Sequence, residues 1–600
     1  MSLNIFYGVK LLEKWFIRNK KGDYKKIARE HNITEFLSKL LVNRDIKDKN
    51  SIELFLNPNL NKMYNPLEMK DLYKAAKIIK EKIIQKKKMR IVGDFDVDGV
   101  MSIYILYTEI KKLGGIVDYT IPDRVNDGYG INKDIVYKAK EDHIDTIITC
   151  DNGIAAIEQV KLAKELGLNV IVTDHHDIPF EIDENTNKKQ YIKVDADAVV
   201  NPKQIECKYP FKYLCGAAVA FKLIQGLYIA LEKEVDSTYS LLEYVAMATV
   251  SDVMDLVDEN RIIVKNGLNS LNNTKNIGLK ALMRETGIEN KEISVYHIGF
   301  ILGPNINASG RLDSALKSLE LLLAPDEETA AKFAKELFNY NEERKLLTLN
   351  GFEKIANTID NTNIKEDKVL VIYEPEINES VAGIIAGRIK ERYNKPSIVL
   401  TMGKDGVKGS GRSIEEYNMF DELTKCKDLL SRFGGHPMAA GLSLEERHIP
   451  ILRKRLNENT ALTEDDLIPK VYIDMELPLR YLSFKLINEL KVLEPFGKGN
   501  NKPLFGGKGY KINRGFLLGK DKNVLKLILQ DKDTTIDGLF FGDIQSFESK
   551  VIENYGRDEL DNVYKGLNNN ITMDALYYPS INEYNGFTNI QIVIQSYRFR

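Results

Sequence analysis

The chain has 600 residues, of which 43% are hydrophobic and 29% charged, and its formal net charge is −2. That length exceeds what one hydrophobic core supports, so we expect several domains. Because the net charge is nearly zero, the chain as a whole has no positive field that would indicate binding to nucleic acid. No apolar run is long enough to span a membrane. Four cysteines in so long a chain indicate neither a disulfide framework nor a zinc motif.

Positive charge gathers in two places. Residues 1–50 carry 12 Lys/Arg against 6 Asp/Glu, and residues 80–90 read KEKIIQKKKMR. A solvated helix face accounts for either run taken alone. The first 20 residues interrupt their apolar positions with charges, unlike a signal peptide, so we expect a cytoplasmic protein.

Short β-rich runs alternate with helical periodicity between residues 71 and 200. Such alternation indicates βαβ units around a mostly parallel sheet. Helical periodicity then dominates from 216 to 286. The strands are predicted at 90–92, 117–121, 146–149 and 169–173, and the helices at 71–85, 100–113, 133–141 and 155–166.

A helix is predicted over 326–359, since Pro325 and acidic residues mark its start. It would be about 50 Å long, which favours a spacer between two domains. A second α/β unit follows, with strands at 369–373 and 397–402 around a helix at 380–392.

Two glycine-rich segments come next, GSGRS at 409–413 and GGHPMAAG at 434–441. We expect loops whose backbone N–H groups bind phosphate, the second loop preceding a helix. From 468 onwards alternating strands predict a small antiparallel barrel or sandwich. Its clearest strands are 524–529, 535–541, 571–577 and 590–597.

Acidic and histidine residues follow several of these strands. They lie in GDFDVDGV (93–100), TCDNG (149–153), TDHH (173–176) and SDVMD (251–255). In open parallel sheets, ligands bind beyond the carboxyl ends of the strands. Carboxylates gathered there repel one another unless a cation lies between them, and two divalent metal ions would serve. Aspartate and histidine favour Mn²⁺ or Mg²⁺ over a thiolate zinc site.

Each of these motifs also has a simpler interpretation. The DxDxDG run opens an EF-hand loop as well, but that loop needs a glutamate where this chain has Ile105. A turn that favours Asp and Gly is a second alternative. Asp252 could be a helix cap, and a histidine is more often structural than a ligand when it stands alone.

Together these segments resemble the ordered motifs of the DHH phosphoesterase superfamily and its DHH-associated domain. The segments NASGR (307–311), ESVAGIIAGRI (379–389), EPFGKGNNKPLF (494–505) and KWFIR (14–18) resemble RecJ-type single-strand-specific exonucleases. The resemblance runs nearly end to end. One departure is Asp255, where related sequences often carry proline, and this residue adds a charge near the site.

The resemblance implies an α/β fold with a parallel-sheet DHH domain, a connecting helix, a DHH-associated domain and an OB-like β-barrel. The expected limits are 1–70 for a basic N-terminal segment, 71–320 for the DHH domain, 321–360 for the connecting helix, 361–460 for the DHH-associated domain and 461–600 for the OB-like barrel. In the barrel, a base-stacking role and a core role both remain open for Phe516, Phe540, Phe541, Tyr577 and Tyr578.

The resemblance also implies roles for individual residues. His176 would lie against the reacting phosphate, and Asp174 would orient the histidines. The metal ligands would be Asp94, Asp96, Asp98, Asp151, His175 and Asp252. The substrate contacts would be Arg124, Arg311, Ser410, Arg412, Ser413, Gly434, Gly435 and His436.

The implied function is 5′→3′ degradation of single-stranded DNA to 5′-mononucleotides, in recombination and repair, with two Mn²⁺ or Mg²⁺ ions. A monomer is expected, with a helicase and a single-strand-binding protein as candidate partners. The alternative is a DHH phosphodiesterase acting on short oligonucleotides or cyclic dinucleotides. A catalytically inactive DNA-binding scaffold and an inorganic pyrophosphatase are further alternatives.

Overall fold

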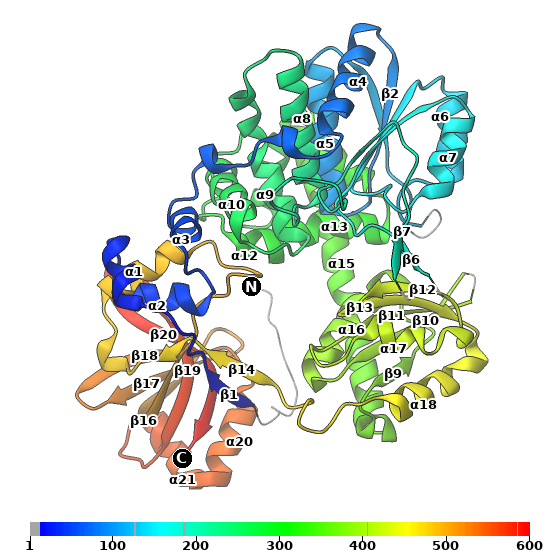
Figure 1. Ribbon diagram of the computed structural model, residues 1–600. Helices are drawn as coiled ribbons and strands as arrows, with labels where there is room; N and C mark the ends of the chain where they lie inside the picture. Colours follow the sequence, from blue (N-terminus) through cyan, green and yellow to red (C-terminus); the bar gives the residue numbers. More distant parts are fainter. Residues whose placement is uncertain (1–12, 125–127, 184–187, 405, 585) are drawn as a thin grey trace. The chain divides into compact units, whose positions relative to one another are not determined.

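The computed structural model describes residues 13–124, 128–183, 188–404, 406–584 and 586–600. The chain divides into two units (Figure 1). Unit 2 comprises Lys49–Leu346 and Pro495–Asn501, and unit 1 comprises Met1–Asp48, Leu347–Glu494 and Lys502–Arg600. Across the described ranges, no helix is both long and apolar enough to cross a lipid bilayer.

Unit 2 is built on a parallel sheet with the strand order β3-β2-β4-β5-β8. Its central strand β4 is buried along its whole length, as expected of a strand covered on both faces. Ile147 and Ile148 therefore belong to different cores, because successive side chains point to opposite faces. The strands are β2 (Lys88–Val92), β3 (Ile116–Thr120), β4 (Thr146–Cys150), β5 (Asn169–Thr173) and β8 (Ala198–Val200).

Helices cover both faces of this sheet (Figure 1). The predicted βαβ alternation is confirmed, with one informative shift at α5, which begins at Val97 rather than Val100. Asp96 caps its first turn, so Asp98 is already helical. One face packs on α4 (Leu72–Ile84), α5 (Val97–Lys112) and α8 (Gly216–Ala230), and the other on α6 (Lys133–Glu141) and α7 (Ile157–Glu165).

The rest of unit 2 is mainly helical. It contains α3 (Lys49–Leu56), α9 (Leu242–Ser251), α10 (Asp258–Leu271), α11 (Ile277–Glu285), α12 (Val295–His297), the π-helical segment η4 (Ile298–Leu302), α13 (Gly303–Leu312) and α14 (Leu316–Leu322). A short hairpin of β6 (Phe180–Ile182) and β7 (Lys189–Tyr191) follows β5. The predicted long helix is present as α15 (Glu327–Asp360). The two units divide within it, and its role as a spacer stays a prediction, as do the domain limits.

Unit 1 contains a mixed sheet with the order β12-β13-β11-β10-β9, together with α16 (Glu379–Tyr393), α17 (Met419–Thr424) and α18 (Ile449–Asn459). Residues 409–412 lie in β11 and residues 434–441 form the β12–β13 hairpin, so the prediction that both glycine-rich segments are loops is wrong. A helix does follow the second segment, after the end of β13. Glycine is needed at Gly435, where φ is 152° and a β-carbon would lie 2.3 Å from the Ala439 carbonyl oxygen. The strands are β9 (Leu370–Tyr373), β10 (Ser397–Gly403), β11 (Gly406–Arg412), β12 (Leu430–His436) and β13 (Ala439–Leu444).

The C-terminal strands close into a barrel, because β16 pairs with both β17 and β19. The four predicted strands are present, but sequence reasoning missed β16, whose glycines and basic residues hide its alternation. The barrel strands are β15 (Met475–Glu476), β16 (Phe505–Leu518), β17 (Val524–Asp531), β18 (Thr534–Phe540), β19 (Thr572–Tyr584) and β20 (Phe587–Phe599). The helices α19 (Phe484–Leu490), α20 (Ile544–Tyr555) and α21 (Arg557–Lys565) lie between these strands in sequence.

The aromatic residues proposed for the barrel separate by burial. Tyr577 and Phe540 belong to the core, and Phe541 is 55% exposed. Phe516 and Tyr578 are half-buried, each beneath a cation, Arg514 and Lys502 respectively. The core role therefore holds for two of the five.

The predicted N-terminal segment is divided: its residues up to Asp48 belong to unit 1 and the rest to unit 2, and residues 1–12 lie outside the described part. Strand β1 (Lys14–Ile17) pairs in parallel with β14 (Lys470–Ile473). The helices α1 (Tyr24–Glu30) and α2 (Glu35–Asn43) follow. The side-chain amide of Asn43, the last residue of α2, donates to the Asp474 carbonyl at 2.8 Å. Buried Arg44 also pairs with the Asp474 carboxylate at 3.3 Å.

Candidate metal centre and active site

Three aspartates follow β2 in a turn that leads into α5. Oδ1 of Asp96 accepts the backbone N–H groups of Asp98 at 3.0 Å and Gly99 at 3.1 Å, which fixes the helix start. Gly99 is required there, because a β-carbon would lie 2.4 Å from the Asp94 carbonyl oxygen. The turn thus holds three carboxylates at the carboxyl end of the sheet.

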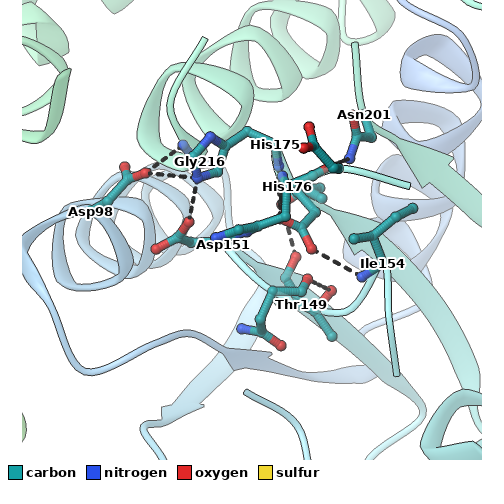
Figure 2. Close-up of polar contacts among 12 residues, drawn as sticks. Asp98, Thr149, Asp151, Ile154, His175, His176, Asn201 and Gly216 are labelled. Atoms are coloured by element: carbon teal, nitrogen blue, oxygen red, sulfur yellow. Dashed lines mark hydrogen bonds and ion pairs between the residues drawn. The ribbon is translucent and has the colours of Figure 1, made fainter. Parts of the chain in front are cut away.

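Asp98 is fixed from a distant part of the chain. Its two carboxylate oxygens accept the backbone N–H groups of Gly216 at 2.6 Å and Ala217 at 2.7 Å (Figure 2). These N–H groups open α8, where the helix dipole favours negative charge. The contact orients Asp98 before any ligand binds.

Asp151 follows β4 in a left-handed backbone conformation, with φ at 61°, which aspartate tolerates. It packs tightly on α8, since a β-carbon at Gly216 would lie 2.6 Å from Cβ of Asp151. Its backbone carbonyl accepts the hydroxyl of Tyr129 at 2.7 Å.

The ring of His175 lies among the acidic side chains, and Figure 2 shows its contacts with Asp98 and Asp151. Its Nε2 is 3.1 Å from Oδ1 of Asp151, 3.6 Å from Oδ2 of Asp98 and 3.8 Å from Oδ2 of Asp252. Burial lowers the pKa of His175, which favours the neutral ring that can bind a metal. The structure therefore brings together aspartates from three separate segments around one imidazole.

His176 points to a different set of partners. Its Nδ1 lies 2.7 Å from Oδ1 of Asp174, and the Tyr129 hydroxyl lies 3.2 Å from its ring. Against the cost of burial, the hydrogen bond and charge of Asp174 raise the pKa of His176 to about 9. The pKa of Asp174 falls to about 2, because these interactions outweigh its burial. Asp174 thus holds His176 in place.

Burial is the main cause that raises the pKa values of Asp94, Asp96, Asp151 and Asp252, and repulsion from neighbouring carboxylates adds to it. The pKa values of Asp94 and Asp151 lie well above the ordinary range, and that of Asp252 rises to about 8. Among the described residues, the buried atoms Oδ1 of Asp94, Oδ1 of Asp151 and Nδ1 of His175 make no hydrogen bond. A cation would relieve both the repulsion and the missing contacts.

In the part of the chain that the structure describes, three groups of side chains each place their ligand atoms within 4.8 Å of one another. Asp151 is in two groups and His175 is in two, so the groups adjoin. Oxygen and imidazole donors of this kind fit Mn²⁺ or Mg²⁺. The groups are Asp94/Asp96/Asp151, Asp98/His175/Asp252 and Asp151/His175/His176.

Two predicted substrate contacts lie in the same unit as this cluster. The guanidinium of Arg124 is 4.7 Å from the centroid of the Phe95 ring, and its charge partly opposes the rise that burial causes in the pKa of Asp94. Arg311 is in α13, whose Asn307 side chain accepts the backbone N–H of Val97 at 3.0 Å. The α13 helix therefore supports the aspartate turn.

The other predicted substrate contacts are in unit 1: Ser410, Arg412, Ser413, Gly434, Gly435 and His436. The Arg412 guanidinium donates to Oγ of Ser410 at 3.1 Å. Ser413 is buried, and its hydroxyl donates to the Tyr417 carbonyl at 2.6 Å.

Sequence reasoning missed several residues of the site. Tyr129 lies between two glycines with positive φ, Gly128 and Gly130, and this GYG run was the available signal. Gly216 and Ala217 had no signal, because their role depends on backbone N–H groups.

Family models match three parts of the chain: "DHH family, N-terminal domain" over residues 88–249, "DHHA1 domain" over 366–461 and "RecJ OB domain" over 473–596. The chain is 36% identical over 539 residues to the single-stranded-DNA-specific exonuclease RecJ of Bacillus subtilis, covering 89% of this chain and 66% of that protein. It is 31% identical to the RecJ exonuclease of Escherichia coli, covering 88% of this chain and 90% of that protein.

Solved structures agree with these relatives. RecJ of Thermus thermophilus in complex with Mn²⁺ superposes with a TM-score of 0.79 at 26% identity, covering 98% of this chain and 79% of that one. The same protein in complex with Mg²⁺ gives a TM-score of 0.74 at 25% identity, covering 98% and 78% of the two chains. Identity, coverage and the three matched domains show that this chain belongs to the RecJ family.

Proposed function

We propose that this chain is a metal-dependent exonuclease that degrades single-stranded DNA from the 5′ end and releases 5′-mononucleotides, in recombination and repair. The convergence of Asp98, Asp151 and Asp252 on Nε2 of His175 carries the proposal. The names of the relatives, which are single-stranded-DNA-specific exonucleases, support the substrate.

Six side chains would hold two Mn²⁺ or Mg²⁺ ions: Asp94, Asp96, Asp98, Asp151, His175 and Asp252. When bound, such ions supply Lewis acidity and a nucleophilic water at neutral pH. The chain's own contribution is position, because Asp98 is fixed by the start of α8 and Asp96 by the start of α5.

His176 would contact the reacting phosphate as a hydrogen-bond donor, held by Asp174 and by the hydroxyl of Tyr129. The proposed contacts to phosphate and to the 5′ end stay Arg124, Arg311, Ser410, Arg412, Ser413, Gly434, Gly435 and His436. We further propose a cytoplasmic monomer that acts with a helicase and a single-strand-binding protein. Four unpaired, buried cysteines are consistent with a reducing compartment.

The test is cleavage of end-labelled DNA with Mn²⁺ present. The substrates are a single strand with a 5′ phosphate, a single strand with a blocked 5′ end, a blunt duplex and a five-nucleotide oligomer. The proposal expects mononucleotides from the free 5′ end and none from the duplex. Cleavage of the short oligomer alone would instead indicate a short-oligonucleotide phosphodiesterase, and no cleavage would indicate a binding scaffold.

A further inference from the structure

Two stacked aromatic rings lie exposed on the segment that leads into α13. Tyr296 and Phe300 are 53% and 62% exposed, and their ring centroids are 5.1 Å apart with planes inclined by 26°. Exposing so much aromatic surface to water is unfavourable, so a ligand that covers it gains free energy. We call this pair the Tyr296–Phe300 platform.

The backbone that carries the platform is unusual and lies against the candidate metal centre. The turn η4 is π-helical, a rare conformation that is frequently found at functional sites. A β-carbon at Gly299 would lie 3.8 Å from Val250, and one at Gly303 would lie 2.7 Å from Oγ of Ser251. Since Ser251 directly precedes Asp252, the platform segment packs on the turn that carries a proposed metal ligand.

That turn is itself strained. Val253 follows Asp252 with φ at 55°, a left-handed conformation that is rare for a β-branched residue, and its side chain is 59% exposed. Strained residues of this kind cluster at active sites and ligand clamps, where surrounding structure fixes them. An apolar side chain is thus held in solvent beside the cluster.

A cation lies next to the platform segment. Residues 495–501 belong to unit 2 and pack beside this segment: a β-carbon at Gly497 would lie 3.8 Å from Val295, which directly precedes Tyr296. The next residue, Lys498, has a side chain 58% exposed, with Nζ 3.6 Å from the Asp255 carboxylate. Its backbone carbonyl accepts the N–H of Leu256 at 2.8 Å, which anchors the loop.

We propose that Tyr296 and Phe300 stack on a base of the DNA strand and that Lys498 contacts a backbone phosphate, beside the metal centre. The inference rests on the proposed function and specifies how this site holds the strand. Aromatic faces with a nearby cation suit single strands of any sequence, because every unpaired base offers a π face. The exposed pair with Asp255 is weak enough to release Lys498 to a phosphate.

The first experiment compares normal and abasic DNA. We would measure kcat/KM for 5′-phosphorylated single strands that carry one abasic residue, moved stepwise from the 5′ end. At the position that meets the platform, wild-type kcat/KM should fall by about 5- to 150-fold, the range for one stacked base. A chain with both Tyr296→Ala and Phe300→Ala should show a similar loss on normal DNA and no added loss at that position.

Three variants separate stacking from folding. Phe300→Trp should retain wild-type kcat/KM, because the larger ring still stacks. Phe300→Leu keeps an apolar side chain but should lose the sensitivity to the abasic position. Tyr137→Ala removes another exposed aromatic ring, 49% exposed on α6, and should leave the abasic profile unchanged.

The second experiment addresses Lys498. Lys498→Gln should reduce the slope of log affinity against log salt by about 0.7, the value for one phosphate contact on a single strand. Asp255→Asn removes the partner charge and should leave that slope at the wild-type value or increase it. An unchanged slope in Lys498→Gln would overturn the phosphate contact.

Failure of the platform and failure of the proposed function give different results. A wild-type chain that leaves single strands intact contradicts the proposed function, and the platform falls with it. If the wild-type chain degrades DNA and the platform variants keep the wild-type abasic profile, the proposed function stands and only the stacking proposal is overturned. If the platform variants instead change the sedimentation coefficient, the two rings form a contact between copies of the chain, and the stacking proposal is again overturned.

Discussion

Oδ1 of Asp174 lies 2.7 Å from Nδ1 of His176, and the other oxygen of Asp174 accepts the backbone N–H of Ile154 at 2.9 Å. A carboxylate held at both oxygens fixes the orientation of the imidazole that would face the phosphate. Backbone N–H groups of His175 and His176 also donate to Oδ1, at 2.7 and 3.1 Å. This arrangement makes Asp174 a positioning residue.

Asp174→Asn should lower kcat by about 10- to 100-fold, because an amide neither orients the His176 ring nor stabilises its protonated form as a carboxylate does. The Mn²⁺-induced rise in melting temperature should persist, since Asp174 is not a proposed ligand. Kinetics with Mn²⁺ and thermal melts with and without Mn²⁺ check both parts. Loss of the Mn²⁺ effect would instead place Asp174 among the ligands.

Asp151→Asn should separate repulsion from metal binding. Without metal the variant should melt at a higher temperature than wild type, because one of the buried, mutually repelling carboxylates is gone. With Mn²⁺ at about 100 times its Kd, wild type should gain about 2.7 kcal/mol of stability and the variant much less. Thermal melts after chelation and after Mn²⁺ addition test this, with Asp134→Asn at an exposed position of α6 as the control. Equal Mn²⁺ gains in wild type and Asp151→Asn would refute the ligand assignment.

Gly216→Ala should disrupt the site without replacing any charged residue. Its new methyl would lie 2.6 Å from Cβ and 2.7 Å from Oδ1 of Asp151, so that carboxylate must move. We expect Mn²⁺ affinity to fall by about tenfold or more. Gly387→Ala in α16 is the control, because its methyl would meet no atom within 4 Å and should stabilise the helix by about 1 kcal/mol. Mn²⁺ titrations that agree between Gly216→Ala and wild type would contradict the packing argument.

Arg412→Ala should raise KM for DNA with a 5′ phosphate by about tenfold or more, the scale of one charged hydrogen bond, and keep the Mn²⁺ effect on melting. The guanidinium is preorganised by its contact with Ser410. Arg392→Ala is a matched control, because Arg392 pairs with Asp360 on the same unit. If Arg412→Ala lost the Mn²⁺ effect, the proposed division of roles would be wrong.

Lys222→Ala should destabilise unit 2 by about 3–5 kcal/mol, because it leaves a buried carboxylate without its cation. Lys222 and Glu259 are both fully buried and lie 2.7 Å apart, joining α8 to α10. The double variant Lys222→Met with Glu259→Gln should recover part of the loss, and denaturant unfolding measures it. A double variant less stable than Lys222→Ala would contradict this account.

The sequence by itself determined the elements whose pattern is local. Residues 146–149 and 169–173 indicate buried strands because nearly every position is apolar or β-branched, and the periodicity of 326–359 indicates a helix. The strand-end aspartates and the TDHH histidines were predictable because parallel strands end at one edge of a sheet.

Only the tertiary structure decided what holds those side chains. Gly216 and Ala217 donate to Asp98 across more than 100 residues, and the loop at 495–501 packs beside Asp255. It also showed that 409–413 and 434–441 are paired strands. The physical reason is that hydrophobic periodicity depends only on residues that are close together in the sequence. A backbone N–H can donate to a residue far away in sequence, and a glycine can leave space for one. Only the fold decides which residue that is.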